Sequence, residues 1–162
     1  ERARLAALLR EVLARPRDPA SLRAEVLAMR AEMAAHKPPA GPLDAKLLRG
    51  GLVDAEFIVH FLQLRDGTAL HPSLERAIAG LIAAGRLPPE LAAHHLMLTR
   101  LLVAARLLAP DGTRPPPAAM AALAAACGFA DEAALMAALA AARRAIAACW
   151  AALFDQQLEI DT

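Results

Sequence analysis

The chain has 162 residues, of which 57% are hydrophobic and only 3% are aromatic, and its formal net charge is +1. This length fits one domain with a sizeable hydrophobic core. The near-neutral charge, with no Lys/Arg cluster interleaved with aromatic residues, argues against a nucleic-acid-binding protein.

Most of the apolar residues are Ala and Leu, which enter helices at the smallest entropic cost. β-branched residues never form the alternating run that is typical of a strand. The composition therefore predicts an all-α fold, an antiparallel bundle of about six to seven helices in a single domain over residues 1–162. Cys127 and Cys149 lie in Ala-rich helical surroundings, and we interpret them as small buried side chains in a reducing compartment.

Residues 1–36 are predicted to form an N-terminal helical hairpin. Its first helix ends at Arg15-Pro16, and Asp18-Pro19 begins the second, because an N-cap carboxylate followed by proline is a strong helix start. The second helix is expected to present one apolar face, made of Leu22, Val26, Met29 and Met33. Residues 37–51 contain three prolines and three glycines and therefore form a connector, within which residues 43–48 are expected to be extended.

Residues 52–157 are predicted to form the main helical bundle. Its helices are expected at about 52–66, from Pro72 to Gly85, at about 90–108, from the prolines at 115–117 to Cys127, and from Asp131 towards Phe154. A turn is expected at Asp111-Gly112. The most apolar run, residues 96–109, is too short to span a membrane and contains two arginines, so we expect a cytoplasmic protein with no membrane contact.

A double glycine, Gly50-Gly51, stands at the start of the third predicted helix. Glycine allows positive φ and close approach of another group, and the free N–H groups of a first helical turn attract anions. Lys46 and Arg49 lie just upstream and add positive charge. Two interpretations stay open: a corner that faces a phosphate or nucleotide, and a tight turn that changes the direction of the chain.

The helix after this turn carries a polar stripe in an otherwise apolar sequence. Glu56, His60 and Gln63 follow one another at helical spacing, and Asp54 lies in the first turn, where a carboxylate complements the helix dipole. A Glu/His pair without a third ligand does not indicate a metal site. The two serines of the chain lie in no nucleophile-elbow sequence, so the sequence predicts no catalytic residue and no metal site.

These segments resemble the glutamine synthetase adenylyltransferase family. The resemblance lies in Met29-Arg30-Ala31-Glu32-Met33, Asp44-x-Lys46, Gly50-Gly51-Leu52-Val53-Asp54-x-Glu56-Phe57-Ile58-Val59 and Gln63-Leu64. It continues through His95-Leu96 and Leu98-Thr99-Arg100 and is expected to cover nearly the whole chain. The family usually has Pro at the position of Arg49, a branched aliphatic residue at Ala55, and Gln and Tyr at His60 and Phe61.

The resemblance implies a two-headed enzyme in which each half has a nucleotidyltransferase domain followed by a helical domain. The two halves attach AMP to a tyrosine of glutamine synthetase and remove it. That chemistry needs a Gly-Ser and Asp-x-Asp constellation with ATP and Mg²⁺, and this chain has no such constellation. It is therefore expected to be a non-catalytic helical domain without a cofactor of its own. Leu52-Val53-Asp54 after the glycines favours the C-terminal, AMP-adding half.

The resemblance also implies partners. A catalytic nucleotidyltransferase domain is expected upstream, since the chain begins at Glu1 within helical periodicity. Glutamine synthetase and the PII signal protein are expected to contact the helices. The candidates for nucleotide, phosphate or domain-interface contact are Lys46, Arg49, Gly50, Gly51, Asp54 and Glu56, and His60 and Gln63 are expected to face a partner.

Three alternatives remain open. The first is a helical part of PII uridylyltransferase, which should carry a downstream metal-dependent phosphohydrolase segment, although no His-Asp pair occurs in this sequence. The second is a free-standing helical protein-interaction module. The third is direct nucleotide binding at the glycine corner, which predicts that Lys46→Ala weakens the binding of ATP.

Overall fold

The computed structural model describes residues 1–110 and 113–160. Within these ranges the chain forms seven helices and no strand. The helices are α1 (Arg2–Leu13), α2 (Pro19–His36), α3 (Leu52–Asp66), α4 (Leu74–Ala83), α5 (Glu90–Leu108), α6 (Pro117–Cys127) and α7 (Glu132–Phe154). The predicted all-α fold with six to seven helices is confirmed. The expected turn at Asp111-Gly112 lies outside the described residues.

The helix boundaries follow the capping residues of the sequence. The Asp18 carboxylate accepts a hydrogen bond from the Ser21 amide at the start of α2, and Asp131 caps α7 in the same way through the Ala134 amide. Gly67 and Gly128 end α3 and α6 in the left-handed conformation. α4 begins two residues after Pro72, because Ser73 is its N-cap.

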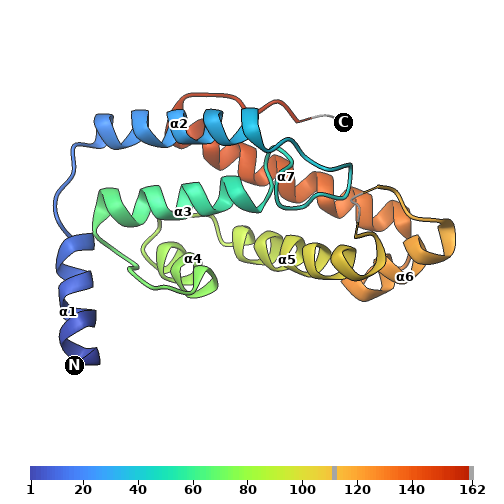
Figure 1. The fold of residues 1–162 in the computed structure, drawn as a ribbon, viewed down its shortest axis with the longest axis horizontal. Helices are drawn as coiled ribbons and strands as arrows, with labels where there is room; N and C mark the ends of the chain where they lie inside the picture. Colours follow the sequence, from blue (N-terminus) through green and yellow to red (C-terminus); the bar gives the residue numbers. More distant parts are fainter. Residues whose placement is uncertain (111–112, 161–162) are drawn as a thin grey trace.

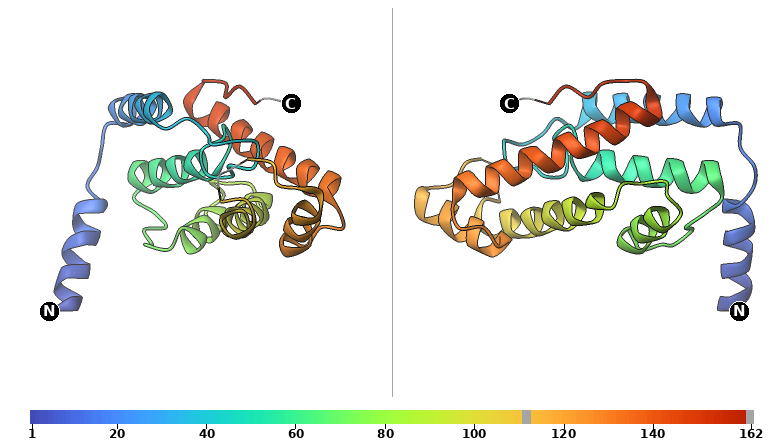
Figure 2. Two further views of the ribbon diagram at one scale, coloured as in Figure 1. Left: turned by 45° about the vertical axis from the view of Figure 1, so that its right-hand side comes forward. Right: turned by 180° about the vertical axis from the view of Figure 1, so that it is seen from behind.

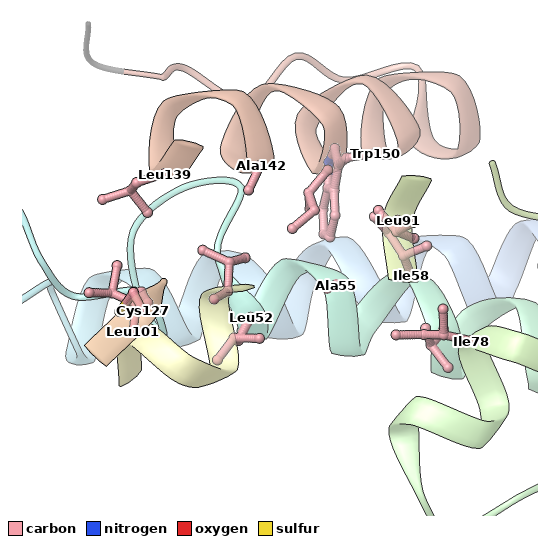
Figure 3. Close-up of a cluster of buried hydrophobic side chains, with 14 of the residues drawn as sticks. Leu52, Ala55, Ile58, Ile78, Leu91, Leu101, Cys127, Leu139, Ala142 and Trp150 are labelled. Atoms are coloured by element: carbon pink, nitrogen blue, oxygen red, sulfur yellow. The ribbon is translucent and has the colours of Figure 1, made fainter. Parts of the chain in front are cut away.

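α3 lies at the centre of the bundle. α2 runs along one side of it, α7 crosses behind both, and α5 lies below with α4 and α6 at its ends (Figure 1). Figure 3 shows side chains of the core, in which Ile58 of α3, Leu101 of α5 and Trp150 of α7 are buried. Trp150 packs edge-on against Phe57, with ring centroids 6.5 Å apart.

The first helix stands apart from this arrangement. α1 projects at an angle to α2 and does not fold back along it, so the expected hairpin over residues 1–36 is not formed (Figures 1 and 2). α2 packs instead on α3, as a part of the main bundle. The physical reason is that α2 buries Leu22 in the core and that its buried Arg30 pairs with Asp54 of α3. The remaining division, into 37–51 and 52–157, stays a prediction.

Two helices, α5 and α7, are long and apolar enough to cross a membrane by length and composition alone. The core helices of globular proteins pass the same test, so this is weak evidence for a membrane span. α7 buries eight residues within the bundle, among them Arg143 and Trp150. Part of its apolar character is thus explained by packing inside the chain.

Candidate functional site

The connector before α3 is a series of turns. The Asp44 side chain accepts hydrogen bonds from the amides of Lys46 (3.1 Å) and Leu47 (3.0 Å), and it also accepts one from the Ala40 amide. The expectation that residues 43–48 are extended is therefore wrong. An aspartate that binds the backbone two and three residues ahead closes a turn, and it competes with the extended conformation.

Both glycines of the corner are buried against the chain itself. Gly50 has φ +73°, and a Cβ placed on it would lie 2.3 Å from the carbonyl oxygen of Arg143 on α7. A Cβ on Gly51 would lie 2.6 Å from the Ala45 carbonyl oxygen. The double glycine thus allows the corner to touch α7 and to close on the connector. Gly50 and Gly51 are both buried, and their contact with an upstream domain stays a prediction.

Asp54 connects three parts of the fold. Its side chain is fully buried, Oδ2 accepts a hydrogen bond from the Gly50 amide (2.7 Å), and Oδ1 lies 2.5 Å from Nε of Arg30 on α2. The Arg30 side chain is itself only 4% exposed. A buried ion pair with supporting hydrogen bonds fixes geometry, so Asp54 orders the corner between α2 and α3.

The amides at the start of α3 have partners within the chain. The Gly51 amide donates to Leu48 O (2.8 Å), the Leu52 amide to Ala45 O (2.9 Å) and the Val53 amide to Lys46 O (3.1 Å). These are the groups that would hold an anion at a helix N-terminus. A phosphate at this corner would therefore need side-chain donors.

Arginine side chains supply such donors next to the corner. Arg49 is half-buried, and its carbonyl oxygen accepts a hydrogen bond from Nε of Arg143 (2.8 Å). Arg30 and Arg49 together line two cavities, of about 200 Å³ and about 260 Å³. Lys46 lies half-buried in the connector and is not among the residues that line either cavity. The sequence-based candidates thus converge only at Arg49, Gly50, Gly51 and Asp54.

The predicted polar stripe does not form one surface. His60 is exposed and Glu56 is half-buried. Gln63, which was expected to face a partner, is buried instead, and its Nε2 donates a hydrogen bond to the carbonyl oxygen of Ala69 (2.7 Å). The amide holds the loop that follows α3. His60 is therefore the one member of the stripe with an exposed side chain.

Sequence reasoning missed three residues of the site: Arg30, Arg143 and Trp150, which lines the smaller of the two cavities. Arg30 belongs to the Met29-Arg30 segment of the family resemblance, but no role was assigned to it. A signal was present, since a carboxylate in the first turn of an apolar helix needs a cationic partner if it is buried. Trp150 and Arg143 come from α7, about one hundred residues further along the chain, and no local pattern predicts that contact.

Comparison with known proteins gives partial matches to one kind of enzyme. The chain is 47% identical over 90 residues to a bifunctional glutamine synthetase adenylyltransferase/adenylyl-removing enzyme of Aromatoleum aromaticum, which covers 51% of the chain and 10% of that protein. It is 40% identical over 107 residues to the enzyme of the same name from Chromobacterium violaceum, covering 59% and 12%. A Bradyrhizobium enzyme of that name is 41% identical over 63 residues, covering 39% and 6%.

These matches support the adenylyltransferase family. The chain spans only 6–12% of the length of these relatives, and the aligned stretches cover 39–59% of the chain. The resemblance is therefore shorter than the nearly full-length similarity expected from the motifs. No protein-family model matches the chain, and no solved structure matches it.

Proposed function

We propose that the chain is a non-catalytic helical domain of a glutamine synthetase adenylyltransferase. In this proposal it supports ATP-dependent transfer of AMP to glutamine synthetase, in the control of bacterial nitrogen assimilation, and it works in the cytoplasm. The observation that carries the proposal is the 47% identity over 90 residues to an enzyme named for this activity, on an all-helical chain. Among the described residues, no group of three His, Cys, Asp or Glu side chains is arranged to hold a metal ion.

The geometry of the corner fits a structural role, in which the chain holds a neighbouring domain in place. The ion pair of Arg30 and Asp54, together with the contact of Gly50 with α7, makes a rigid junction between three helices. A rigid junction can hold a neighbouring domain in one orientation, which is what positions reactants for in-line transfer. In the parent enzyme ATP and Mg²⁺ would be bound by an upstream nucleotidyltransferase domain, in the C-terminal, AMP-adding half.

Two sets of side chains are available for partners in this proposal. Lys46, Arg49 and Glu56 are half-buried near the corner and would contact the catalytic domain. His60 is exposed on α3 and would face glutamine synthetase or the PII signal protein.

The test measures AMP transfer to glutamine synthetase by the isolated chain and by a full-length relative that contains this chain. Purified chain is incubated with labelled ATP, Mg²⁺ and glutamine synthetase, and no label should reach glutamine synthetase. The full-length Chromobacterium violaceum relative, with this chain exchanged for its matching segment, should transfer AMP. Deleting the exchanged segment should abolish or strongly reduce that transfer. AMP transfer by the chain alone, or undiminished transfer by the deleted enzyme, would contradict the proposal.

A second candidate, a helical protein-interaction module, is favoured by α1. Its large apolar side chains are exposed, for example Leu5 (59%), Leu8 (51%) and Leu9 (54%). Exposed apolar faces of this kind commonly mark interaction sites. If this candidate holds, Leu8→Glu in the exchanged segment abolishes partner binding while AMP transfer by the chimera stays normal.

A further inference from the structure

A small cavity lies between α2, the glycine corner and the residues after α7. Its volume is about 200 Å³, and its walls include side chains from three separate parts of the chain. These are Leu27, Arg30, Arg49, Trp150, Gln156 and Gln157. The cavity is thus built by the same contacts that order the corner, but it does not use the amides of α3.

Trp150 supplies an unsatisfied donor at this cavity. The side chain is 1% exposed, and its Nε1 has no hydrogen-bond partner within residues 1–110 and 113–160. Most buried polar groups are paired, because an unpaired one costs about 1–3 kcal/mol. Trp150 is one of the residues that line the cavity, so a group held there lies beside the side chain that carries this unpaired donor.

Two guanidinium groups border the same space. Arg30 is 3% exposed and uses Nε and one terminal nitrogen on Asp54, while a guanidinium carries five N–H groups in all. The ion pairs formed within the described part of the chain do not include Arg49. Gln156 and Gln157 also line the cavity, and Glu159 is the acid on its wall.

Cationic side chains also lie beyond the cavity. The second cavity, of about 260 Å³, shares Arg30 and Arg49 and is also lined by Lys37 and Arg143. Four cationic side chains therefore surround this region, against the buried carboxylate of Asp54 and the exposed one of Glu159. Partly buried charges are screened less by salt than exposed ones, so the region favours an anion.

We propose that the 200 Å³ cavity binds a phosphoryl group, held by Arg30, Arg49 and the indole N–H of Trp150. The donors come from α2, the connector and α7, and so approach from several directions. A tetrahedral oxyanion accepts hydrogen bonds in this way, whereas the two oxygens of a carboxylate lie in one plane. The cavity is smaller than the roughly 300–1,000 Å³ of sites that enclose drug-sized ligands, so it fits a free phosphate or the phosphate of a small ester. This site does not rest on the proposed function, although Arg49 belongs to both.

The test uses Trp150 as a built-in probe, because it is the single tryptophan of the chain. Inorganic phosphate is titrated into ¹⁵N-labelled chain at constant ionic strength, and the indole Nε1–H resonance is followed. A saturable downfield shift in the millimolar range is expected. Methyl phosphate and acetate are titrated in parallel, to distinguish a free phosphate from an ester and a phosphoryl group from a carboxylate. Acetate should bind at least about tenfold more weakly than phosphate, because it fills fewer of the donor positions.

Three variants sharpen the result. Arg49→Gln should weaken phosphate binding by about tenfold or more, because a hydrogen bond to a charged group is lost. Lys46→Gln removes the same charge from the same connector but lines neither cavity, and should leave the dissociation constant within about twofold. Glu159→Gln should tighten binding, since it removes a like charge from the wall.

Several outcomes would overturn the proposal. An indole resonance that phosphate does not move would mean that the cavity holds only water. A shift of equal affinity with acetate would assign the site to carboxylates. If Arg49→Gln and Lys46→Gln weakened phosphate binding equally, phosphate would be attracted by the general positive charge of the chain and not held by Arg49. None of these results bears on AMP transfer, so failure here is distinguishable from failure of the proposed function.

Discussion

Nε of Arg30 lies 2.5 Å from Oδ1 of Asp54, and the two side chains are 4% and 0% exposed. The charges of this pair compensate each other in a medium of low dielectric constant, where an uncompensated charge is costly. The second carboxylate oxygen accepts a hydrogen bond from the Gly50 amide (2.7 Å) and a longer one from a terminal nitrogen of Arg30 (3.4 Å). One carboxylate thus fixes the angle between α2, α3 and the glycine corner.

Asp54→Asn should therefore lower the free energy of unfolding by about 3–5 kcal/mol, because it leaves the Arg30 guanidinium buried without a counter-charge. Urea denaturation followed by circular dichroism measures this. Asp155→Asn is the matched control, since Asp155 pairs with Arg23 at 3.0 Å but is 80% exposed. It should cost less than about 1 kcal/mol. Equal losses from the two variants would show that the buried ion pair of Arg30 and Asp54 stabilises the fold no more than an exposed pair does.

Gly50→Ala should be much more damaging than Gly67→Ala. Both glycines have positive φ, +73° and +62°, where an alanine costs about 1–2 kcal/mol. A Cβ at Gly67 meets open space, whereas one at Gly50 would lie 2.3 Å from the backbone oxygen of Arg143. Displacing α7 should add about 1–3 kcal/mol or more to the loss. Thermal unfolding of both variants gives the difference, and equal melting temperatures would argue against the contact with α7.

The helices of this chain can be predicted from its sequence because local interactions of neighbouring residues determine where each helix begins and ends. Asp18, Ser73 and Asp131 each supply an oxygen to an amide of the first helical turn, and Gly67 and Gly128 end helices in the left-handed conformation. Capping and φ preferences depend only on neighbouring residues, so they can be recognised without knowing the fold.

The candidate site, in contrast, depends on contacts between residues that lie far apart in the sequence. Hydrophobic spacing placed Met29 on the buried face of α2, but Met29 is 58% exposed and the neighbouring Arg30 is 3% exposed. The buried position goes to the arginine because Asp54, 24 residues later, needs a cation there. The role of Gly50 likewise depends on Arg143, far along the chain. The motif could be recognised, but the partner of each of its residues could not.

His95 should make stability depend on pH. Burial lowers the pKa of His95 below its usual value, although Glu75 and Glu56 pull it partly back. The unfolded chain then binds a proton more readily than the folded one, so this contribution to stability is present above about pH 6.5 and is lost as the pH falls through the lowered pKa. Urea midpoints between pH 8 and pH 5, which bracket about 6.5, should fall on acidification.

His95→Gln should reduce this fall, and His94→Gln, at the adjacent position on α5, serves as its control. A pH dependence that His94→Gln alters as much as His95→Gln would assign the effect to the helix in general. Asp66 does not add to the pH dependence in this range. Its pKa is lowered, chiefly by the hydrogen bond from Arg65, so its own contribution is lost only below the usual range of a carboxyl group.

The two cysteines should react slowly with thiol reagents in the folded chain. Burial raises the pKa of both thiols, with the charge of Glu90 adding to the effect at Cys149. A raised pKa lowers the thiolate fraction near neutral pH, and the thiolate is the reacting species. Cys127 is 4% exposed on α6, whereas Cys149 is half-buried on α7, so Cys149 should react first. Modification by a chromogenic disulfide, followed at pH 8 with and without urea, measures both rates. Cys149→Ala should remove the faster phase and leave a slow phase that urea accelerates. A fast phase that persists in this variant would place Cys127 at the surface and contradict its position in the core.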